Sequence, residues 1–383
     1  MKNDIVLFLF IKDITLGGGA ERVVVNMANE FAEIYGRVHI ISKYRKNPEI
    51  KYALNPLVMV HYLKPKSKYD TWRWQDNPVT RLMGTWIYSL GFTRNMYRIV
   101  EEYTQPQDTA VILLNSYEIP LYHKRHTVLV GVDHCSFPYM VDAYRRQSWL
   151  RQIYSYFERL LPRNIDIVTC LTDAQLNEWK SLNRPVYVMP NFVGEIPYRI
   201  PTYASRKKII LSMGRMWDDI KGFDRLINIF SKVVAQFPDW KLRILGEGVL
   251  KEEYEKMIDE KDLRAYVEIL DFTQNPLYEY QMASIYAVCS RFEGFSMVLA
   301  EAMVNGLPAI SYKTFGPNSI IKDSVTGYLV FNGDEKSYCE RLIQMMEDCD
   351  LREQMGKDAR EDIISRFSPS VVVKRWIDLF DKI

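Results

Sequence analysis

The chain has 383 residues, and because a single hydrophobic core stops growing at roughly 250–300 residues, we expect two domains. Its composition, 48% hydrophobic and 26% charged, is that of an ordinary globular protein, and its five cysteines form no C-x-x-C pair, which argues against a zinc site or a disulfide framework. The net charge of +2 conceals +6 on residues 1–193 and −4 on the remainder, which indicates different partners for the two halves.

The cysteines and the apolar segments also bear on the compartment. An odd number of unpaired cysteines favours a reducing environment. Residues 5–11 are apolar, but the run is only seven residues long and Lys12 and Asp13 follow it at once, so it predicts a buried first strand and not a secretion signal. No apolar stretch approaches the ~20 residues of a membrane-spanning helix. We expect a cytoplasmic protein for which surface contact with a membrane stays open.

In the first half, apolar runs alternate with amphipathic stretches, the pattern of βαβ units on a parallel sheet. A first strand at residues 5–11 leads through a glycine turn to a helix near 20–34. Further strands are expected at 38–42, 110–115, 127–132 and 167–171. Residues 185–201 are richer in Pro and Gly, which indicates a connection between domains.

The second half repeats this architecture without repeating its sequence. Strands are expected at 208–213, 242–246, 267–271, 286–289, 308–311 and 328–331. Helices are expected at 223–236, 250–260, 276–284, 335–347, 351–366 and 371–380. The predicted organisation is a first domain at 1–193, a linker at 194–206, a second domain at 207–368 and a C-terminal helix at 369–383.

A glycine-rich turn follows the first strand. The segment Gly17-Gly-Gly-Ala-Glu-Arg22 lets the backbone approach a ligand closely, and the helix beyond it can receive an anion at its N-terminus. It matches neither the dinucleotide motif nor the P-loop, which disfavours ordinary dinucleotide and ATP sites. A plain flexible turn is the alternative.

Basic residues follow the first strand of the second half. Gly214 and Arg215 end that strand, and Lys221 and Gly222 precede the next helix. Ligands bind at the carboxyl ends of strands in open α/β sheets, and a guanidinium with an ammonium there suits a diphosphate. Ordinary solvated surface charges are the alternative.

The most informative segment is Glu293-Gly-Phe-Ser-Met-Val-Leu-Ala-Glu301, which Gly306 and Pro308 terminate. A single unbroken helix would set its two carboxylates about 80° apart. We therefore place Glu293 in the turn before a helix and Glu301 in its early turns. There both can accept from sugar hydroxyls while the helix N-terminus receives a phosphate. Two unrelated glutamates at a buried helix start are the alternative.

Two further groups of residues have the features of functional sites. His134 follows an apolar strand of the first half, which makes it a site candidate, although a hydrogen-bonded loop histidine explains it equally well. Asp348-Cys-Asp350 has the D-x-D pattern of metal-dependent sugar transferases, but it lies in a polar turn between helices, so no metal site is expected.

Two segments mix basic and aromatic residues. Residues 62–98 carry seven Lys/Arg against two Asp, interleaved with Trp, Tyr and Phe, and residues 144–163 continue the pattern. Such a mixture suits an anionic membrane surface. A helical hairpin with its aromatic residues in the core is the alternative. Single-stranded nucleic acid is a third option that no motif supports, so no nucleic-acid partner is expected.

Taken in order, these segments resemble the family-4 retaining glycosyltransferases of the GT-B fold over nearly the whole chain. The matching segments are Gly18–Arg22, Asp133-His134, Gly214-Arg215 with Lys221-Gly222, Glu293–Glu301, and Gly316-Pro317 with Gly327–Val330. The resemblance implies two Rossmann-like domains whose parallel sheets face each other across a cleft, with a C-terminal helix that crosses back to the first domain.

The resemblance also implies roles for individual residues. Arg215 and Lys221, beside Gly214, hold the donor diphosphate, Glu301 accepts from the ribose, and Glu293 accepts from the donor sugar. Backbone groups of Gly294, Phe295, Ser296, Met297 and Val298 face the sugar or the phosphate. Gly18 and Gly19 approach the phosphate from the first domain, and His134 lies beside the transferred sugar.

Two positions depart from the family's pattern. Cys135 replaces a Ser or Thr, and Ser319 replaces an acidic residue, which weakens any inference about the sugar. The resemblance implies a retaining, metal-independent transferase that uses a nucleotide-sugar, preferably of UDP, and a glycan acceptor that is lipid-linked, in cell-surface polysaccharide synthesis. A nucleotide-sugar hydrolase or epimerase and a non-catalytic sensor or scaffold are the alternatives.

Overall fold

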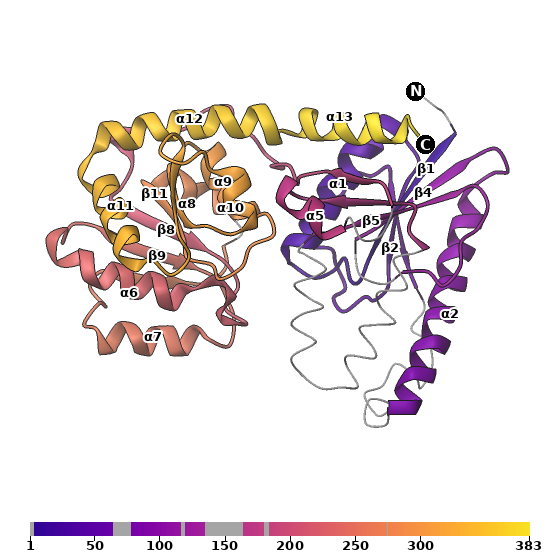
Figure 1. The fold of residues 1–383 in the computed structure, drawn as a ribbon, viewed down its shortest axis with the longest axis horizontal. Coiled ribbons are helices and arrows are strands. Elements are labelled where there is room, and N and C mark those ends of the chain that lie inside the picture. Colours follow the sequence, from indigo (N-terminus) through magenta and orange to yellow (C-terminus); the bar gives the residue numbers. More distant parts are fainter. Residues whose placement is uncertain (1–3, 64–77, 116–118, 135–163, 180–183, 274) are drawn as a thin grey trace. The chain divides into compact units, whose positions relative to one another are not determined.

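The structure is a computed structural model that describes residues 4–63, 78–115, 119–134, 164–179, 184–273 and 275–383, with side chains omitted for 78–89. The chain divides into two compact units (Figure 1). One unit contains residues 1–190 and 372–383, and the other contains residues 191–371.

The first unit is built on a seven-stranded, wholly parallel sheet in the order β3-β2-β1-β4-β5-β6-β7. Its strands are β1 (Ile5–Ile11), β2 (Val38–Ser42), β3 (Val58–Tyr62), β4 (Thr109–Leu114), β5 (Thr127–Val132), β6 (Ile167–Cys170) and β7 (Val186–Val188). The order 3-2-1-4-5 is that of the doubly wound fold, in which the direction of winding changes between β1 and β4. All residues of β1 are buried, as its continuous apolar run predicts for a central strand.

Helices cover both faces of this sheet (Figure 1). Helix α1 (Gly19–Tyr35) contacts β1 and β2, and α2 (Pro78–Tyr103) brings Phe92 and Met96 into the core that contains Phe8 and Phe10 of β1. The short η3 (Asp173–Gln175) and α5 (Leu176–Trp179) follow β6.

The C-terminal helix α13 (Pro369–Phe380) belongs to the first unit, which confirms the expected return of the chain. The ring of Phe31 in α1 lies 6.2 Å from that of Trp376 and 5.7 Å from that of Phe380, between centroids. Both α13 side chains are almost completely buried. An apolar stripe at helical spacing therefore fixes this helix to α1.

The second unit repeats the doubly wound order in a six-stranded parallel sheet, β10-β9-β8-β11-β12-β13. Its strands are β8 (Ile209–Met213), β9 (Lys241–Leu245), β10 (Val267–Leu270), β11 (Ile285–Val288), β12 (Ala309–Tyr312) and β13 (Gly327–Val330). The winding changes direction between β8 and β11, where such sheets bind their ligands.

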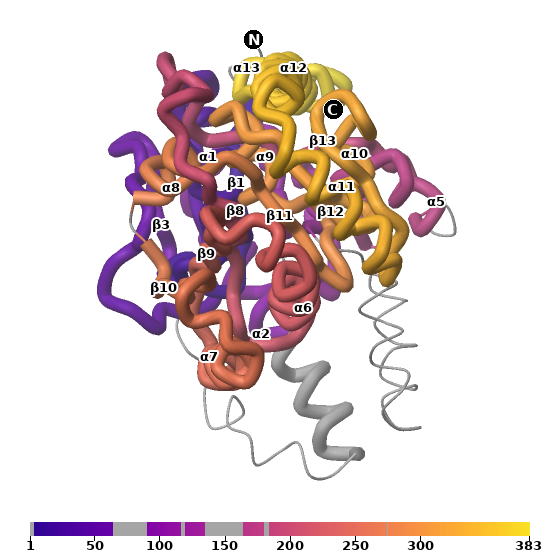
Figure 2. Tube along the Cα trace, turned by 90° about the vertical axis from the view of Figure 1, so that its left-hand side faces the viewer, coloured from indigo at the N-terminus to yellow at the C-terminus, as the bar shows by residue number. Residues whose placement is uncertain are grey.

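The helices of the second unit lie on the two faces of its sheet (Figures 1 and 2). One face carries α6 (Phe223–Val233), extended by η7 (Val234–Gln236), and α7 (Lys251–Glu260). The other carries α9 (Met297–Val304) and α12 (Cys349–Phe367). The remaining helices are η5 (Tyr203–Ser205), η6 (Asp219–Lys221), α8 (Pro276–Met282), α10 (Phe315–Ile320) and α11 (Glu335–Glu347).

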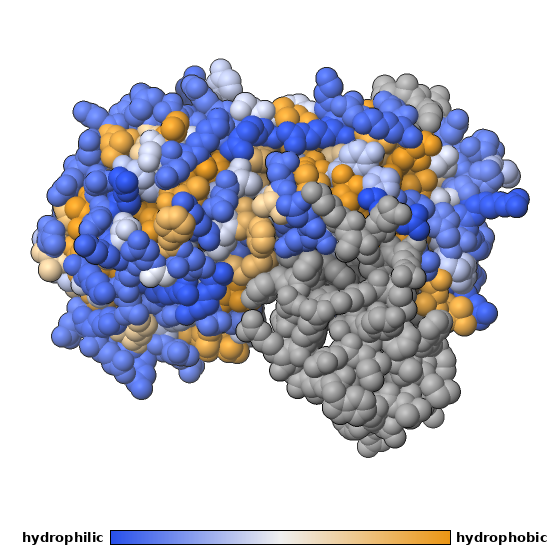
Figure 3. Space-filling view, in the orientation of Figure 1, coloured by the Kyte–Doolittle hydropathy of each residue, from blue (hydrophilic) through white to orange (hydrophobic). Residues whose placement is uncertain are grey.

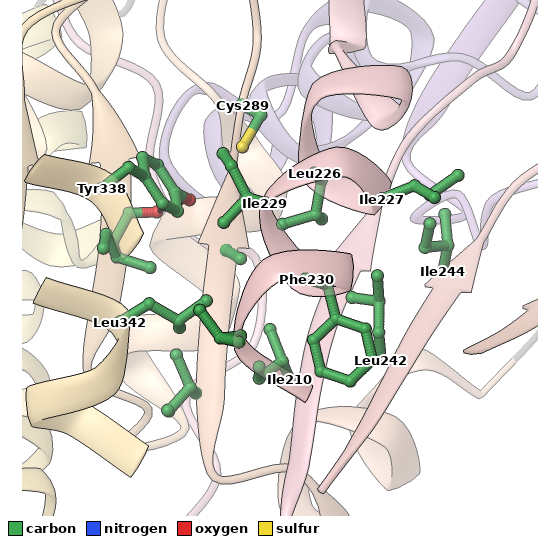
Figure 4. Close-up of a cluster of buried hydrophobic side chains, with 14 of the residues drawn as sticks. Ile210, Leu226, Ile227, Ile229, Phe230, Leu242, Ile244, Cys289, Tyr338 and Leu342 are labelled. Atoms are coloured by element: carbon green, nitrogen blue, oxygen red, sulfur yellow. Dashed lines mark hydrogen bonds between the residues drawn. The ribbon is translucent and has the colours of Figure 1, made fainter. Parts of the chain in front are cut away.

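The core of the second unit forms where α6 meets the sheet and α11 (Figure 4). Leu226 and Phe230 of α6 lie over Ile210 and Leu242 of the strands, all fully buried. Burying such side chains contributes about 1.5–3 kcal/mol each, which makes this packing the main support of the strand ends that carry the candidate site. By contrast α7 buries only Tyr254 and Ile258, and its outer surface is largely hydrophilic (Figure 3).

The strands and helices predicted from apolar periodicity are confirmed, with ends that differ by at most three residues. The sequence analysis did not predict β3 or β7. Both are edge strands with apolar runs of only four residues, at 57–60 and 186–189, and all their residues except Val58 are exposed or half-buried. In addition, β7 lies in the Pro- and Gly-rich segment 185–201.

Candidate functional site

In the second unit the candidate site begins where β8 ends. The backbone N–H of Gly214 donates to the carbonyl of Leu245, so the strand pairing continues to this residue. A Cβ on Gly214 would lie 3.1 Å from the side-chain carbons of Lys221. The glycine therefore leaves room for the stem of Lys221 to cross the end of the strand.

The turn that carries Lys221 is tightly specified. Asp218 caps η6 by accepting the N–H of Ile220 at 3.3 Å. Gly222 ends η6 with a φ of 67°, and a Cβ there would fall 2.1 Å from the carbonyl oxygen of Cys289. Any other residue at this position would be both strained and in collision with the neighbouring strand end. The conformation fixes the direction of the Lys221 side chain.

Lys221 and Glu293 form an ion pair at the switch point of the sheet. The Lys221 ammonium lies 2.5 Å from Oε1 of Glu293, and the Ser290 hydroxyl donates to the same oxygen at 3.1 Å. The side chains are 19% and 10% exposed, so the pair is largely removed from water. Sequence analysis predicted the lysine and the glutamate separately but not that they pair, and it did not identify Ser290.

Glu293 lies before α9, as predicted, and its loop is held against α10. The N–H of Gly316 donates to the Glu293 carbonyl at 3.0 Å. A Cβ on Gly316 would come within 2.2 Å of the carbonyl oxygen of Phe295, so the two loops are in direct backbone contact. The Phe295 ring packs on Phe367, with centroids 5.3 Å apart.

Ser296, the residue just before α9, has a strained backbone conformation. Its φ of 78° is in the left-handed region, which costs a non-glycine residue about 1–2 kcal/mol. Its hydroxyl is buried and bonds to no residue that the structure describes. Strain of this kind is concentrated at ligand sites. The first N–H groups of α9, at Met297 and Val298, have no acceptor inside the helix.

Glu301 lies in the second turn of α9, and Tyr280 of α8 donates its hydroxyl hydrogen to it at 3.0 Å. Burial raises the pKa of Tyr286 well above its usual value, and the charges of both Glu301 and Glu293 raise it further. The two carboxylates therefore act on one phenol at the centre of the sheet. Sequence analysis identified neither tyrosine, because nothing along the chain links them to these glutamates.

Arg215 follows β8 and Gly214 but is not part of the buried pair formed by Lys221 and Glu293. Its side chain is 61% exposed, and its guanidinium lies 3.7 Å from the Asp218 carboxylate. The structure thus brings Gly214, Lys221 and Glu293 together and leaves Arg215 at the surface beside them.

In the first unit the glycine turn follows β1. Gly18 caps α1, and a Cβ on it would fall 2.4 Å from a carboxylate oxygen of Glu21, whereas a Cβ on Gly19 would meet nothing within 4 Å. Burial raises the pKa of the Glu21 carboxyl. Gly19 is therefore the position at which a ligand can approach the backbone.

His134 follows β5 and contacts Asn115, which follows the neighbouring β4. Its Nε2 lies 2.8 Å from the Asn115 side-chain oxygen, so Nε2 carries the proton. Burial lowers the pKa of His134 to about 4, which keeps the imidazole neutral at pH 7. The preceding Asp133 accepts from the indole of Trp179 at 3.1 Å. Asn115 was not identified as a site residue, although its place at a strand end was a usable signal.

The other candidates have structural explanations or lie outside the described residues. Asp348 caps α12 by accepting the N–H of Leu351 at 2.8 Å, and no group of three metal-ligating side chains occurs among the described residues. Segment 144–163 and much of 62–98 lie outside the described part. Within 62–98, Phe92 and Tyr97 are buried core residues. No helix in the described ranges is long and apolar enough to cross a membrane.

Two family models match consecutive parts of the sequence. The model for glycosyltransferase family 4 matches residues 17–194, and that for glycosyl transferases group 1 matches residues 199–362. The chain belongs to the family-4 glycosyltransferases. The two matches meet close to the boundary between the two units, so each unit corresponds to one part of the family-4 fold.

Curated relatives of this family-4 chain come from several organisms. A poly(ribitol-phosphate) alpha-N-acetylglucosaminyltransferase of Staphylococcus aureus is 29% identical over 57% of this chain and 44% of its own length. An uncharacterized glycosyltransferase of Haemophilus influenzae is 23% identical over 92% of this chain and 93% of its own. A Campylobacter jejuni N-acetylgalactosaminyltransferase, named for a diphospho-undecaprenol acceptor, is 26% identical over 90% of this chain and 91% of its own length. The chain thus spans less than half of the first relative.

Solved structures show the same fold. S. aureus TarM, a mutant of which was solved with fondaparinux, alpha-GlcNAc-glycerol and UDP, matches with a TM-score of 0.71 over 98% of this chain and 99% of its own, at 15% identity. Sucrose-phosphate synthase from Thermosynechococcus elongatus matches with a TM-score of 0.77 over 98% of both chains, at 18% identity. The fold is therefore GT-B, as the resemblance implied.

Proposed function

We propose that this chain transfers a sugar from a nucleotide-sugar donor, with UDP-sugars preferred, to a glycan acceptor, and that the bond formed retains the donor's anomeric configuration. The observation that carries the proposal is the largely buried Lys221–Glu293 pair at the switch point of the second sheet, in the loop that leads to α9. This is the position at which doubly wound sheets bind nucleotides.

The charge of the Lys221 ammonium explains how this site can catalyse transfer. The ammonium has three N–H donors, and its contact with Glu293 uses one. Two donors stay available for a diphosphate, together with the N–H groups that open α9 and the exposed fork of Arg215. The diphosphate gains negative charge as the glycosidic bond breaks, so these groups stabilise the transition state more than the bound donor.

The remaining roles are assigned by matching the family's motifs to these positions. Glu301 accepts from the ribose hydroxyls, and Glu293 accepts from the donor sugar. Backbone N–H groups from Gly294 to Val298 bind the sugar or the phosphate. In the first unit, Gly18 and Gly19 approach the phosphate, and neutral His134 lies beside the transferred sugar. The cations of the chain supply the charge stabilisation, so the proposal requires no metal ion.

The names of the relatives support the substrate classes. Poly(ribitol-phosphate) and a diphospho-undecaprenol glycan are acceptors in the names of two of these relatives, and UDP is present in the structure of the S. aureus TarM mutant. We therefore assign this chain a UDP-sugar donor and a lipid-linked or cell-surface glycan acceptor.

A nucleotide series tests the donor part of this proposal. UDP should raise the melting temperature of the protein more than GDP or ADP does at equal concentration, because a ligand that binds only the folded state stabilises it. With a UDP-sugar, nucleotide release should then depend on the acceptor, and the product should keep the donor's anomeric configuration by NMR.

Each alternative predicts a different result in the same assays. A hydrolase releases nucleotide at the same rate without an acceptor, and an epimerase converts the sugar without releasing nucleotide. A sensor or scaffold binds UDP-sugars without turnover across a broad acceptor panel. Any of these three outcomes would refute the proposed transfer.

A further inference from the structure

A pocket of about 730 Å³ opens where β1, β2 and β3 of the first unit end. It adjoins the glycine turn, because Leu16 lines the pocket and directly precedes Gly17, and its lining is strongly basic. Among the described residues that line it, four have cationic side chains and one, Asp13, has an acidic side chain. The cations are Lys12, Lys43, Arg45 and Lys46.

The carboxylate of Asp13 is used to hold the loops that form the pocket. Its Oδ1 accepts the backbone N–H of Thr15 at 3.0 Å and the Thr15 hydroxyl at 2.6 Å. Its Oδ2 accepts the backbone N–H of Lys46 at 3.0 Å. Asp13 thereby ties the loop after β1 to the loop after β2. Lys12, Arg45 and Lys46 form no ion pair with any carboxylate in the described ranges.

Two of the cations are held in place by aromatic rings. Lys43 is only 8% exposed, and its ammonium lies 4.6 Å from the ring centroid of Tyr44. The guanidinium of Arg45 lies 5.0 Å from the ring centroid of Tyr62 and donates to the Pro48 carbonyl at 2.6 Å. Charged side chains are seldom buried at a solvated surface, so these contacts indicate a preformed site.

We propose that this pocket binds a phosphate group of the acceptor, so that the acceptor is a phosphate-bearing glycan carrier. This inference rests on the proposed transferase function and extends it to the chemistry of the acceptor. Several cations converge on one pocket, and a phosphate ester or diphosphate presents several charged oxygens to them. A neutral sugar would leave the charges of Lys12, Arg45 and Lys46 without a counter-ion in the described ranges. The rings of Tyr44 and Tyr62 can contact the glycan beside the phosphate.

The test compares two acceptors that share one glycan, the first with a diphosphate-linked lipid and the second with a neutral alkyl group. The test variant carries Arg45→Gln and Lys46→Gln, which remove two exposed charges without disturbing the core. The matched control carries Lys374→Gln and Arg375→Gln, one lysine and one arginine exposed on α13 of the same unit. A poly(glycerol-phosphate) acceptor in a third arm distinguishes a phosphodiester polymer from a lipid diphosphate.

We expect KM for the phosphate-bearing acceptor to rise at least roughly 10-fold in the Arg45/Lys46 variant, because charge-assisted hydrogen bonds are lost. KM for the neutral acceptor, and all values for the control variant, should stay within about twofold. An equal rise for both acceptors, or an equal effect of the control variant, would refute the pocket's role.

A binding measurement separates this inference from the proposed transfer. With the donor site saturated by UDP, calorimetry with inorganic pyrophosphate and with glycerol phosphate should show binding to the wild-type protein that weakens at least roughly 10-fold in the Arg45/Lys46 variant. If no transfer occurs but this binding is found, the pocket stands and the transferase proposal fails. If transfer occurs and this binding is absent or unchanged in the variant, the pocket proposal fails alone.

Discussion

The pair formed by Lys221 and Glu293 has both a structural and a functional consequence, and a double-mutant cycle separates them. Lys221→Met leaves the Glu293 carboxylate largely buried beside Ser290 alone, so we expect a loss of about 1–3 kcal/mol in the free energy of unfolding. Adding Glu293→Gln should restore most of that stability. Turnover should fall roughly 10–200-fold in the single variant and should not recover in the double variant, because the charge that stabilises the diphosphate is missing from both.

An exposed pair in the same unit provides the control for that cycle. Lys232 and Glu335 also lie 2.5 Å apart, but their side chains are 61% and 38% exposed. Lys232→Met should leave both stability and turnover nearly unchanged, because exposed ion pairs contribute little. If turnover recovered in the Lys221→Met/Glu293→Gln protein, Lys221 would have only a structural role.

For single residues, the sequence predicted which side chains belong to the candidate site better than which side chains they contact. Lys221, Glu293 and Glu301 could be selected because each follows a strand or opens a helix. Ser290 and Tyr280 could not, because their contacts depend on how β11 and α8 lie against α9. Contacts between residues distant in the chain are set by packing, which periodicity along a single sequence does not encode.

Neighbouring strands of the first sheet hold a pair of histidines, of which His39 is buried and His61 half-buried. His39 of β2 lies 3.0 Å from His61 of β3, between ring nitrogens, and its ring stacks on Phe8 with centroids 4.8 Å apart. Burial lowers the pKa of His39 to about 4, and the charges of His61 and Arg37 lower it further. The folded protein therefore keeps His39 neutral at pH values at which the unfolded chain binds a proton.

This pair predicts an acid-sensitive stability. Between the usual pKa of histidine, 6.5, and about 4, only the unfolded state gains the His39 proton, so the free energy of unfolding should fall with pH by up to roughly 3 kcal/mol. His39→Gln keeps a polar partner for His61 but does not titrate. It should remove the His39 part of the pH slope of denaturant-derived stability between pH 7 and 4.5 and leave the part that His134 contributes. His126→Asn removes an exposed histidine whose φ of 59° asparagine tolerates, and it should leave the wild-type slope. An unchanged slope in His39→Gln would contradict the assignment.

Strands were predictable from sequence to the extent that they are buried. The central strands, such as β1 and β8, are continuous apolar runs because helices cover both of their faces. The edge strand β3 exposes Met59, and its apolar run covers only residues 57–60. The basic pocket was not predicted for a related reason. Its cations come from the ends of β1 and β2, and these loops become neighbours only when the strands pair.

At the scale of the whole molecule, α13 makes the stability of the first unit depend on residues near the C-terminus. Trp376 is 2% exposed, so Trp376→Ala should cost about 3–5 kcal/mol. Hydrogen exchange should show the loss as weaker protection of β1 amides, with β8 amides protected as before. Tyr198→Ala changes a side chain that is 92% exposed. It should alter the free energy of unfolding by less than about 0.5 kcal/mol and leave the protection of the β1 and β8 amides as it is. Equal loss of protection in β8 would mean that α13 supports both units alike.

The return of the chain to its first unit also matters during translation. A ribosome completes the strands and α1 of that unit before it synthesises residues 191–371, and α13 comes after them. At roughly 5–20 residues per second, the intervening segment takes on the order of 10–40 s. For that interval the nascent chain carries Phe31 without the helix that covers it in the finished protein.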